Sequence, residues 1–169
     1  MQTSTSAIDV AKFLLSLAQC ESDPEDPVPL TPMLLQKLLY YAQGWWYAEH
    51  NRPLFKESIE AWKFGPVVPE VYQEFKEFGG KPIELPDSGN EWRLCAEEMD
   101  AVREVWNVYR VHSAVALSDM THSEAPWKEA RRGLSPDAQG GRVIQGEAMK
   151  RFFQEELQRS IDRLDAAED

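Results

Sequence analysis

Residues 31–78 decide the fold, and they read TPMLLQKLLYYAQGWWYAEHNRPLFKESIEAWKFGPVVPEVYQEFKEF. Thr31 followed by Pro32 predicts the start of a helix, because threonine caps a helix N-terminus and proline fits its first position. Apolar side chains then recur at helical spacing through Trp46, with few polar residues between them. A helix that is apolar over most of its girth is normally buried among other elements. We therefore expect this helix at the centre of the fold.

The second half of the same stretch predicts a strand, a turn and another helix. Polar and apolar residues alternate over Ser58–Lys63, as in a short strand. Residues 64–66, Phe-Gly-Pro, then turn the chain. A further helix begins at Pro69 and ends at the glycines 79–80. Residues 91–94 alternate as well, and we expect them to form a second short strand that pairs with Ser58–Lys63.

The other helices are predicted from apolar stripes and from residues that favour helix ends. They are a first helix capped by Asp9, a long helix over Ala96–Val111, a short helix capped by Ser113, a helix from Ser123 to Arg132, and a last helix over Glu147–Leu164. Residues 133–146 are rich in Gly, Ser, Pro and Asp and predict a loop. The predicted fold is mainly α: a compact single-domain helical bundle with a central buried helix and a small two-stranded β element.

Length and composition predict one domain. The chain has 169 residues, of which 43% are hydrophobic, so it can bury a substantial core. We expect a disordered N-terminus over residues 1–7, a domain over residues 8–164 and a mobile acidic tail over residues 165–169. No apolar run approaches the roughly 20 residues of a membrane span, and no secretory signal is visible. Two cysteines without CxxC spacing suit a reducing compartment, so we expect a cytoplasmic protein with no membrane partner.

The formal net charge of −11 bears on the partners. Broad nucleic-acid binding requires a basic surface that displaces counterions, so nucleic acid is an unlikely partner for this chain. A basic protein partner is favoured, because opposite fields accelerate encounter. An acidic surface also serves solubility alone.

The sequence offers no recognisable catalytic motif. It lacks GxSxG, HExxH and a phosphate-binding GxxxxGK[ST] loop. Asp119, His122 and Glu124 could hold a metal only if a local turn brought their side chains together. The competing interpretation is that Thr121, His122 and Glu124 order a junction between two helices through hydrogen bonds. We therefore predict no catalytic residue, no metal and no cofactor.

Arg131, Arg132 and Arg142 flank the predicted loop over residues 133–146. They are candidates for binding an anion, but in a chain with a net charge of −11 we expect them to pair with nearby carboxylates.

Several segments, in one order along the chain, resemble the Panacea domain, also called the SocA-like or phage-associated-protein domain. These segments are residues 9–12 (DVAK), 35–44 (LQKLLYYAQG), 53–55 (PLF), 59–62 (IEAW), 65–69 (GPVVP) with Tyr72, 121–127 (THSEAPW), and Ile144 with 152–153 (FF). The resemblance extends over residues 8–153, nearly the whole chain. It implies a compact, mainly helical domain that carries no catalytic residues.

The same resemblance implies a function. Members of the family are similar to antitoxins of bacterial and phage toxin–antitoxin pairs, which neutralise a protein toxin by direct binding. One kind delivers its toxin to a cytosolic protease. We expect this protein to be an antitoxin with a cognate protein toxin as its partner. A protease adaptor is the second hypothesis, and a metal-dependent hydrolase or nuclease is the third.

The family motifs also supply the candidate site residues. Trp62, the 65–69 turn with Gly65 and Pro66, Tyr72 and the 121–127 segment with Thr121, His122, Glu124 and Trp127 are expected to build the shared framework. We expect contacts with the partner from among Tyr41, Trp45, Lys63 and His122, with plain core packing as the alternative for each. Tyrosine and tryptophan suit an interface because they supply a large contact area with one polar end.

Overall fold

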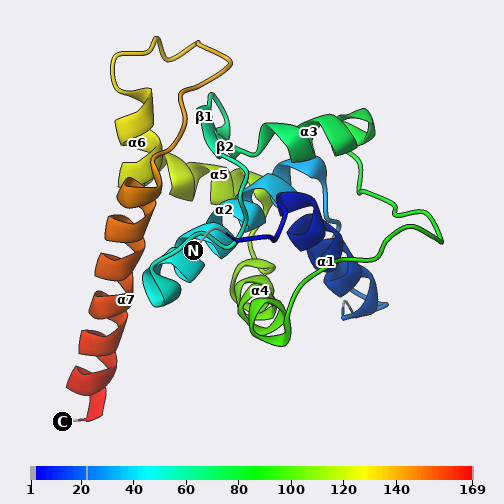
Figure 1. The fold of residues 1–169 in the computed structure, drawn as a ribbon, viewed down its shortest axis with the longest axis horizontal. Helices are drawn as coiled ribbons and strands as arrows, with labels where there is room; N and C mark the ends of the chain where they lie inside the picture. The colour runs from blue at the N-terminus through cyan, green and yellow to red at the C-terminus, as the bar shows by residue number, and fades with distance from the viewer. Residues whose placement is uncertain (1–2, 22, 169) are drawn as a thin grey trace.

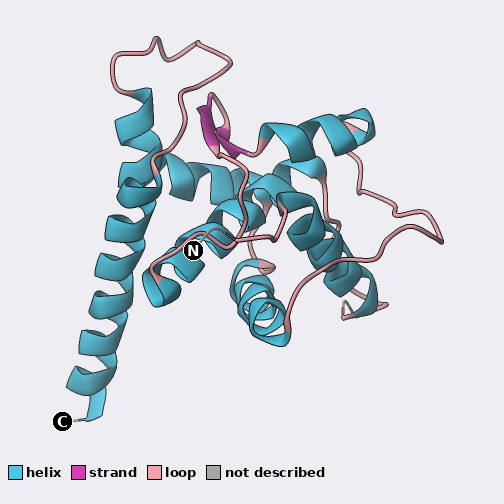
Figure 2. Cartoon of the chain, in the orientation of Figure 1, coloured by secondary structure: helices cyan, strands magenta, loops and turns pink. Residues whose placement is uncertain are grey.

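The computed structural model describes residues 3–21 and 23–168, and helices dominate it (Figures 1 and 2). In chain order the elements are α1 (Ala7–Cys20), α2 (Pro32–His50), β1 (Glu60–Trp62), β2 (Gly65–Val67), α3 (Pro69–Phe75), a short 3-10 turn η1 (Lys76–Phe78), α4 (Ala96–Tyr109), α5 (Ala114–Ser123), α6 (Ala125–Arg131) and α7 (Gly146–Glu168). The predicted fold class is confirmed: the protein is mainly helical with one small antiparallel sheet.

Helix α2 is the centre of the fold, as its apolar girth predicts. The Thr31 hydroxyl accepts from the backbone N–H of Leu34, and Pro32 occupies the first turn. The helix ends at Asn51, whose left-handed backbone (φ 60°) is tolerated by asparagine. Helices α1, α3, α4, α5 and α7 and strand β2 all contact it, so it is covered on every side. Even Gln36 and Lys37 on this helix are buried.

The sheet differs from the prediction in its second strand. β1 pairs with β2 in the register Glu60 with Val67, Ala61 with Pro66 and Trp62 with Gly65. Residues 91–94 form no strand, so their predicted pairing with Ser58–Lys63 is wrong. The physical reason is proximity: a two-residue turn at Lys63–Phe64 closes a hairpin with little loss of chain entropy.

Helix boundaries differ from the prediction at the start of α1 and at the junction of α5 and α6. Ser6, not Asp9, caps α1: its hydroxyl accepts from the Asp9 backbone N–H at 3.1 Å. Ser123 is the last residue of α5, and its hydroxyl donates to the Met120 carbonyl. Glu124 therefore becomes the extended residue that starts α6, one position later than predicted. The Ser113 cap is confirmed, since its side chain accepts from the backbone N–H of Ala116.

The described residues at both ends of the chain take part in local structure. Thr5 is buried, and its hydroxyl donates to Glu98 at 2.7 Å. At the other end, residues 165–168 continue α7, because Asp-Ala-Ala-Glu contains good helix formers. The remaining residues of the predicted disordered start and mobile tail, 1–2 and 169, lie outside the described residues.

Helix α7 packs its first half against α2 and extends beyond the body of the protein with its second half (Figure 1). The contact depends on Gly44 of α2, where the ring of Phe153 lies directly over the helix backbone. The same ring meets Tyr40, Tyr41 and Trp45 edge-on, at centroid distances of 5.6, 6.1 and 5.2 Å. Any side chain at position 44 would occupy the space of that ring.

We expect Gly44→Ala to lower the free energy of unfolding by about 2 kcal/mol. Alanine favours a helix over glycine by about 1 kcal/mol, but overpacking a buried ring costs more. Urea denaturation measures the difference. Gly80→Ala is the control, because a Cβ there meets nothing within 4 Å. Equal stability of the Gly44→Ala variant and the wild type would contradict this account of the α2–α7 contact.

Candidate functional site

The β1–β2 hairpin is built around Gly65, the glycine of the GPVVP motif. Its φ of +118° lies in a region that side chains rarely adopt. A Cβ at this position would also lie 2.6 Å from Cε and 2.7 Å from Nζ of Lys37. Glycine is thus required both by the backbone and by a lysine that passes beneath the hairpin.

Helices α5 and α6 hold the hairpin through three side chains, which we call the hairpin clamp. The Ser118 hydroxyl donates to the Phe64 carbonyl at 2.7 Å. The Trp127 indole N–H donates to the Trp62 carbonyl at 2.9 Å, and Arg131 donates to the Ala61 carbonyl at 3.0 Å. Within the late motif THSEAPW, Trp127 therefore fixes the backbone of the earlier motif IEAW at Trp62, while Ser118 and Arg131 lie outside the motif.

Arg131 also orders the loop that follows α6. Its guanidinium donates to the carbonyls of Ser135, Ala138 and Gly140 at 2.9–3.2 Å, and it is buried. Arg142 donates to the Arg132 carbonyl in the same way. The expectation that these arginines pair with carboxylates is wrong for Arg131 and Arg142, because backbone carbonyls accept their hydrogen bonds instead.

A pocket of about 590 Å³ lies between the hairpin, the start of α2 and α3, and we call it the hairpin pocket. It is lined by Pro32, Met33, Gln36, Lys37, Trp62, Lys63, Phe64, Val67, Tyr72, Gly79, Gln139 and Gly140. Trp62 and Tyr72 meet edge-to-face in its wall, with ring centroids 5.0 Å apart. Phe64 at the hairpin turn is 60% exposed. The structure thus brings the candidates Trp62, Lys63 and Tyr72 to one surface.

The sequence analysis did not predict Phe64 or Lys37 as site residues, although both line this pocket, and Lys37 is the charged one of the two. Its side chain is buried, and it makes no hydrogen bond or ion pair with any residue that the structure describes. Burial lowers the pKa of its ammonium group from 10.5 to about 8. The available signal was its position: Lys37 lies between Leu34, Leu35 and Leu38, on a helix already expected to be covered on all sides.

Lys63, at the rim of the pocket, differs from Lys37. Its ammonium lies 3.5 Å from the Asp137 carboxylate and 5.4 Å from the centroid of the Phe64 ring. Lys63 is therefore partly solvated and already paired.

Two other candidates, Tyr41 and Glu124, meet in a buried network behind the hairpin. The Tyr41 hydroxyl is 3.2 and 3.3 Å from the two Glu124 carboxylate oxygens. Its ring stacks on Tyr109 at 4.0 Å, and the Tyr109 hydroxyl accepts from the Trp45 indole at 2.8 Å. Tyr41 is 1% exposed, so it belongs to the framework and does not reach the surface.

The environment of Glu124 changes its protonation. Burial raises the pKa of this carboxyl from 4.5 to about 7, although the nearby hydroxyls of Tyr40 and Tyr41, of which Tyr41 donates a hydrogen bond, partly oppose the rise. Burial also raises the pKa of Tyr109, to about 12, so this tyrosine stays neutral near pH 7.

His122 packs against Trp127, and its Nε2 atom is buried without a hydrogen-bond partner among the described residues, so the structure shows no hydrogen bond from this side chain that orders the helix junction. The His122 ring lies over Trp127, with centroids 4.2 Å apart, and burial lowers its pKa, with the Lys37 charge as the next cause. The Thr121 hydroxyl donates to the Ser118 carbonyl inside α5. In the described part of the chain no group of three His, Cys, Asp or Glu side chains is arranged to hold a metal ion. Asp119, His122 and Glu124 therefore do not form a group of metal ligands in the described part of the chain.

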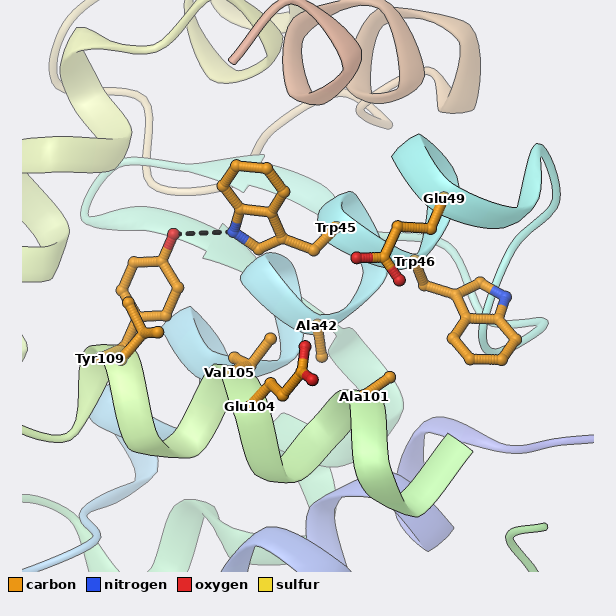
Figure 3. Close-up of a pocket in the computed structure, with 9 residues that line it drawn as sticks. Ala42, Trp45, Trp46, Glu49, Ala101, Glu104, Val105 and Tyr109 are labelled. Carbon is orange, nitrogen blue, oxygen red and sulfur yellow. Dashed lines mark hydrogen bonds between the residues drawn. The ribbon is translucent and has the colours of Figure 1, made fainter. Parts of the chain in front are cut away.

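A second, smaller pocket of about 190 Å³ lies between α2 and α4 (Figure 3). Trp45 and Tyr109 close one end of it through their hydrogen bond. Ala42, Ala101 and Val105 form its apolar floor, and the carboxylates of Glu49 and Glu104 lie over it. Trp45 thus contributes to an acidic, apolar groove separate from the hairpin pocket.

Comparison with known proteins decides the family. The model described as "Antitoxin SocA-like, Panacea domain" matches residues 35–128, more than half of the chain, from α2 into α6. The chain belongs to this family. The match includes α2 from residue 35 onward, the hairpin, and the Ser118 and Trp127 parts of the clamp.

A curated relative supports the same assignment over a shorter stretch. Antitoxin SocA of Caulobacter vibrioides (strain NA1000 / CB15N) is 48% identical over 56 residues, which is 33% of this chain and 30% of that antitoxin. No solved structure matches the chain significantly. Within the described residues, no helix is both long enough and apolar enough to cross a membrane.

The Arg131 contacts predict a large stability effect. Arg131→Met should lower the free energy of unfolding by about 3 kcal/mol, because several buried carbonyls lose their donor. Chemical denaturation measures this, and hydrogen exchange should become faster over residues 135–144. Arg132→Met, on the exposed neighbour, is the control. An unchanged exchange rate in the loop would show that Arg131 does not order it.

Glu124 predicts a pH dependence of stability. Its folded pKa of about 7 exceeds the unfolded value of 4.5, so the native state binds more protons between these pH values. The contribution of Glu124 to the free energy of unfolding is therefore full below pH 4.5 and falls by on the order of 2 kcal/mol as the pH rises through 7.

Glu124→Gln should remove this pH-dependent loss, measured as the difference between variant and wild type in denaturation from pH 4.5 to 7.5. Glu155→Gln on the exposed face of α7 is the control, and it should leave the wild-type curve unchanged. Parallel curves for Glu124→Gln and the wild type would contradict the assigned pKa shift.

Proposed function

We propose that this protein is an antitoxin that neutralises a cognate protein toxin by binding it directly, with the hairpin and its pocket as the contact surface. Family membership carries the first part of the proposal, and the name of the relative, an antitoxin, agrees with it. The second part rests on one observation: the exposed Phe64 stands at the turn of a hairpin whose backbone is fixed by the clamp. A rigid element that presents aromatic side chains suits a hot spot of binding.

The charge of the protein supports a basic toxin. The net charge of −11 would steer such a partner, and the Glu49 and Glu104 groove offers carboxylates to its lysines or arginines. We place the encounter in the cytoplasm, where the free and exposed thiols of Cys20 and Cys95 would stay reduced.

Co-expression tests the function itself. The product of the adjacent gene should arrest growth when expressed alone and should be harmless when this protein is expressed with it. The two proteins should elute together in size-exclusion chromatography. If the neighbouring product does not inhibit growth by itself, or if the two proteins fail to bind, the antitoxin proposal is overturned.

Phe64 tests the contact surface. Phe64→Ser should abolish growth rescue while changing the free energy of unfolding by less than about 0.5 kcal/mol, because the ring is mostly exposed. Val111→Ser, at a position 76% exposed and outside the hairpin pocket, is the matched control and should rescue growth fully. Rescue by Phe64→Ser equal to that of the control would place the contact elsewhere.

A second candidate is an adaptor that delivers the toxin to a cytosolic protease. The feature that favours it is the second half of α7, which projects from the body and exposes Ile161 and Leu164 (Figure 1). Such a segment is available to a third protein while the hairpin holds the toxin. The lifetime of the toxin in cells with and without the protease separates the two hypotheses, and equal lifetimes would exclude the adaptor.

A further inference from the structure

The buried ammonium group of Lys37 lacks a partner among the described residues. A charge taken out of water costs several kcal/mol unless it is paired or hydrogen-bonded. Lys37 is 1% exposed, yet no carboxylate or carbonyl of the described chain receives its protons. The fold makes room for it at the expense of position 65, which has to be glycine. An unpaired lysine kept in this way indicates that its partner comes from another molecule.

The position of Lys37 gives access to such a molecule. Lys37 lies in the lining of the hairpin pocket, together with the apolar side chains of Met33, Val67, Trp62 and Tyr72. A group that enters between these walls reaches the ammonium after leaving bulk water behind. An ion pair formed there is strengthened by the low local dielectric.

The charges around the pocket define the ligand. The pocket is lined by two lysines and no carboxylate, although the protein as a whole carries a net charge of −11. Lys63 is already paired with Asp137, which leaves Lys37 as the unpaired cation. One free cation without an arginine fork suits a monoanionic carboxylate better than a phosphate, which is normally held by several donors. The surrounding apolar walls require that the carboxylate be carried on an apolar segment.

We propose that the hairpin pocket receives an aspartate or glutamate side chain of the partner toxin, flanked by apolar residues, and that Lys37 pairs with its carboxylate. This proposal rests on the antitoxin function and names the chemistry of the contact. The flanking apolar residues pack against Trp62 and Phe64. A toxin that is basic overall would thus be recognised at this point through one of its acidic residues.

The test is Lys37→Met, which keeps the volume of the side chain and removes the charge. The affinity for the purified toxin, measured by calorimetry, should fall about 30-fold or more, because breaking a buried charge pair at an interface is costly. The thermal unfolding midpoint of the free protein should stay the same or rise, since an unpaired buried charge is lost. Lys81→Met, which removes one exposed lysine outside the pocket, should bind within about twofold of the wild type.

The acidic partner is identified by substituting each Asp and Glu of the toxin with Asn or Gln. One substitution should weaken binding to the wild type strongly and binding to Lys37→Met hardly at all, as a double-mutant cycle requires. If none does, or if only removal of the toxin's C-terminal carboxylate does, the proposed side-chain pair is wrong.

The outcomes separate this proposal from the function on which it rests. A wild type that does not bind the toxin overturns both. A wild type that binds, together with a Lys37→Met variant of equal affinity, overturns only the carboxylate pair and leaves the antitoxin function intact. A Lys37→Met variant that is less stable than the wild type would show that the ammonium serves the fold, and this also overturns the proposal.

Discussion

The burial of α2 on every side is the constraint on which the rest of the structure depends. A helix with apolar residues over most of its girth cannot bury its apolar surface against one neighbour. Helices α1, α3, α4, α5 and α7 therefore all pack against it. Polar groups on such a helix need internal partners. Gln36 and Gln43 have them: Gln36 accepts from the Val68 N–H, and Gln43 accepts from those of Leu54 and Phe55, fixing the segments before and after the hairpin.

The hairpin is the point where segments far apart in sequence become one unit. Two paired strands of three residues each would not be stable alone. They persist because α2 lies beneath them, α5 and α6 donate to their carbonyls, and Ile144 from the late loop donates to the Ile59 carbonyl at 2.7 Å. The surface that carries Trp62 and Phe64 is consequently set by the whole domain, and substitutions in α5 or α6 can reach it without touching it.

Much of the fold could be predicted from local sequence, and the predictions that were wrong have physical reasons. The Thr31 and Ser113 caps and the girth of α2 were predicted because each depends on residues within a few positions. The partner of β1 was predicted wrongly, because the alternation of polar and apolar residues at 91–94 does not indicate which segments lie side by side in the fold. Ser123 and Glu124 are both plausible helix starts, and only the extended backbone of Glu124 decides between them.

The structure brings some of the predicted site residues together and separates others. Trp62, Lys63 and Tyr72 do share one surface, whereas Tyr41 is held inside by Glu124. Lys37 was overlooked because a single polar residue in a helical run looks like a solvated position, although it lies on a helix that was expected to be covered on all sides.

The packing of Phe153 over Gly44 has a consequence for synthesis at the ribosome. Gly44 is on α2, and the ring that packs over it is on α7, 109 positions later. Until residue 153 has left the exit tunnel, the side of Tyr40, Tyr41 and Trp45 that Phe153 covers stays open to water. A nascent chain of this protein therefore acquires its closed core late in translation, and a transcript cut short before this codon yields a product with an exposed apolar surface, which suits recognition by chaperones and proteases.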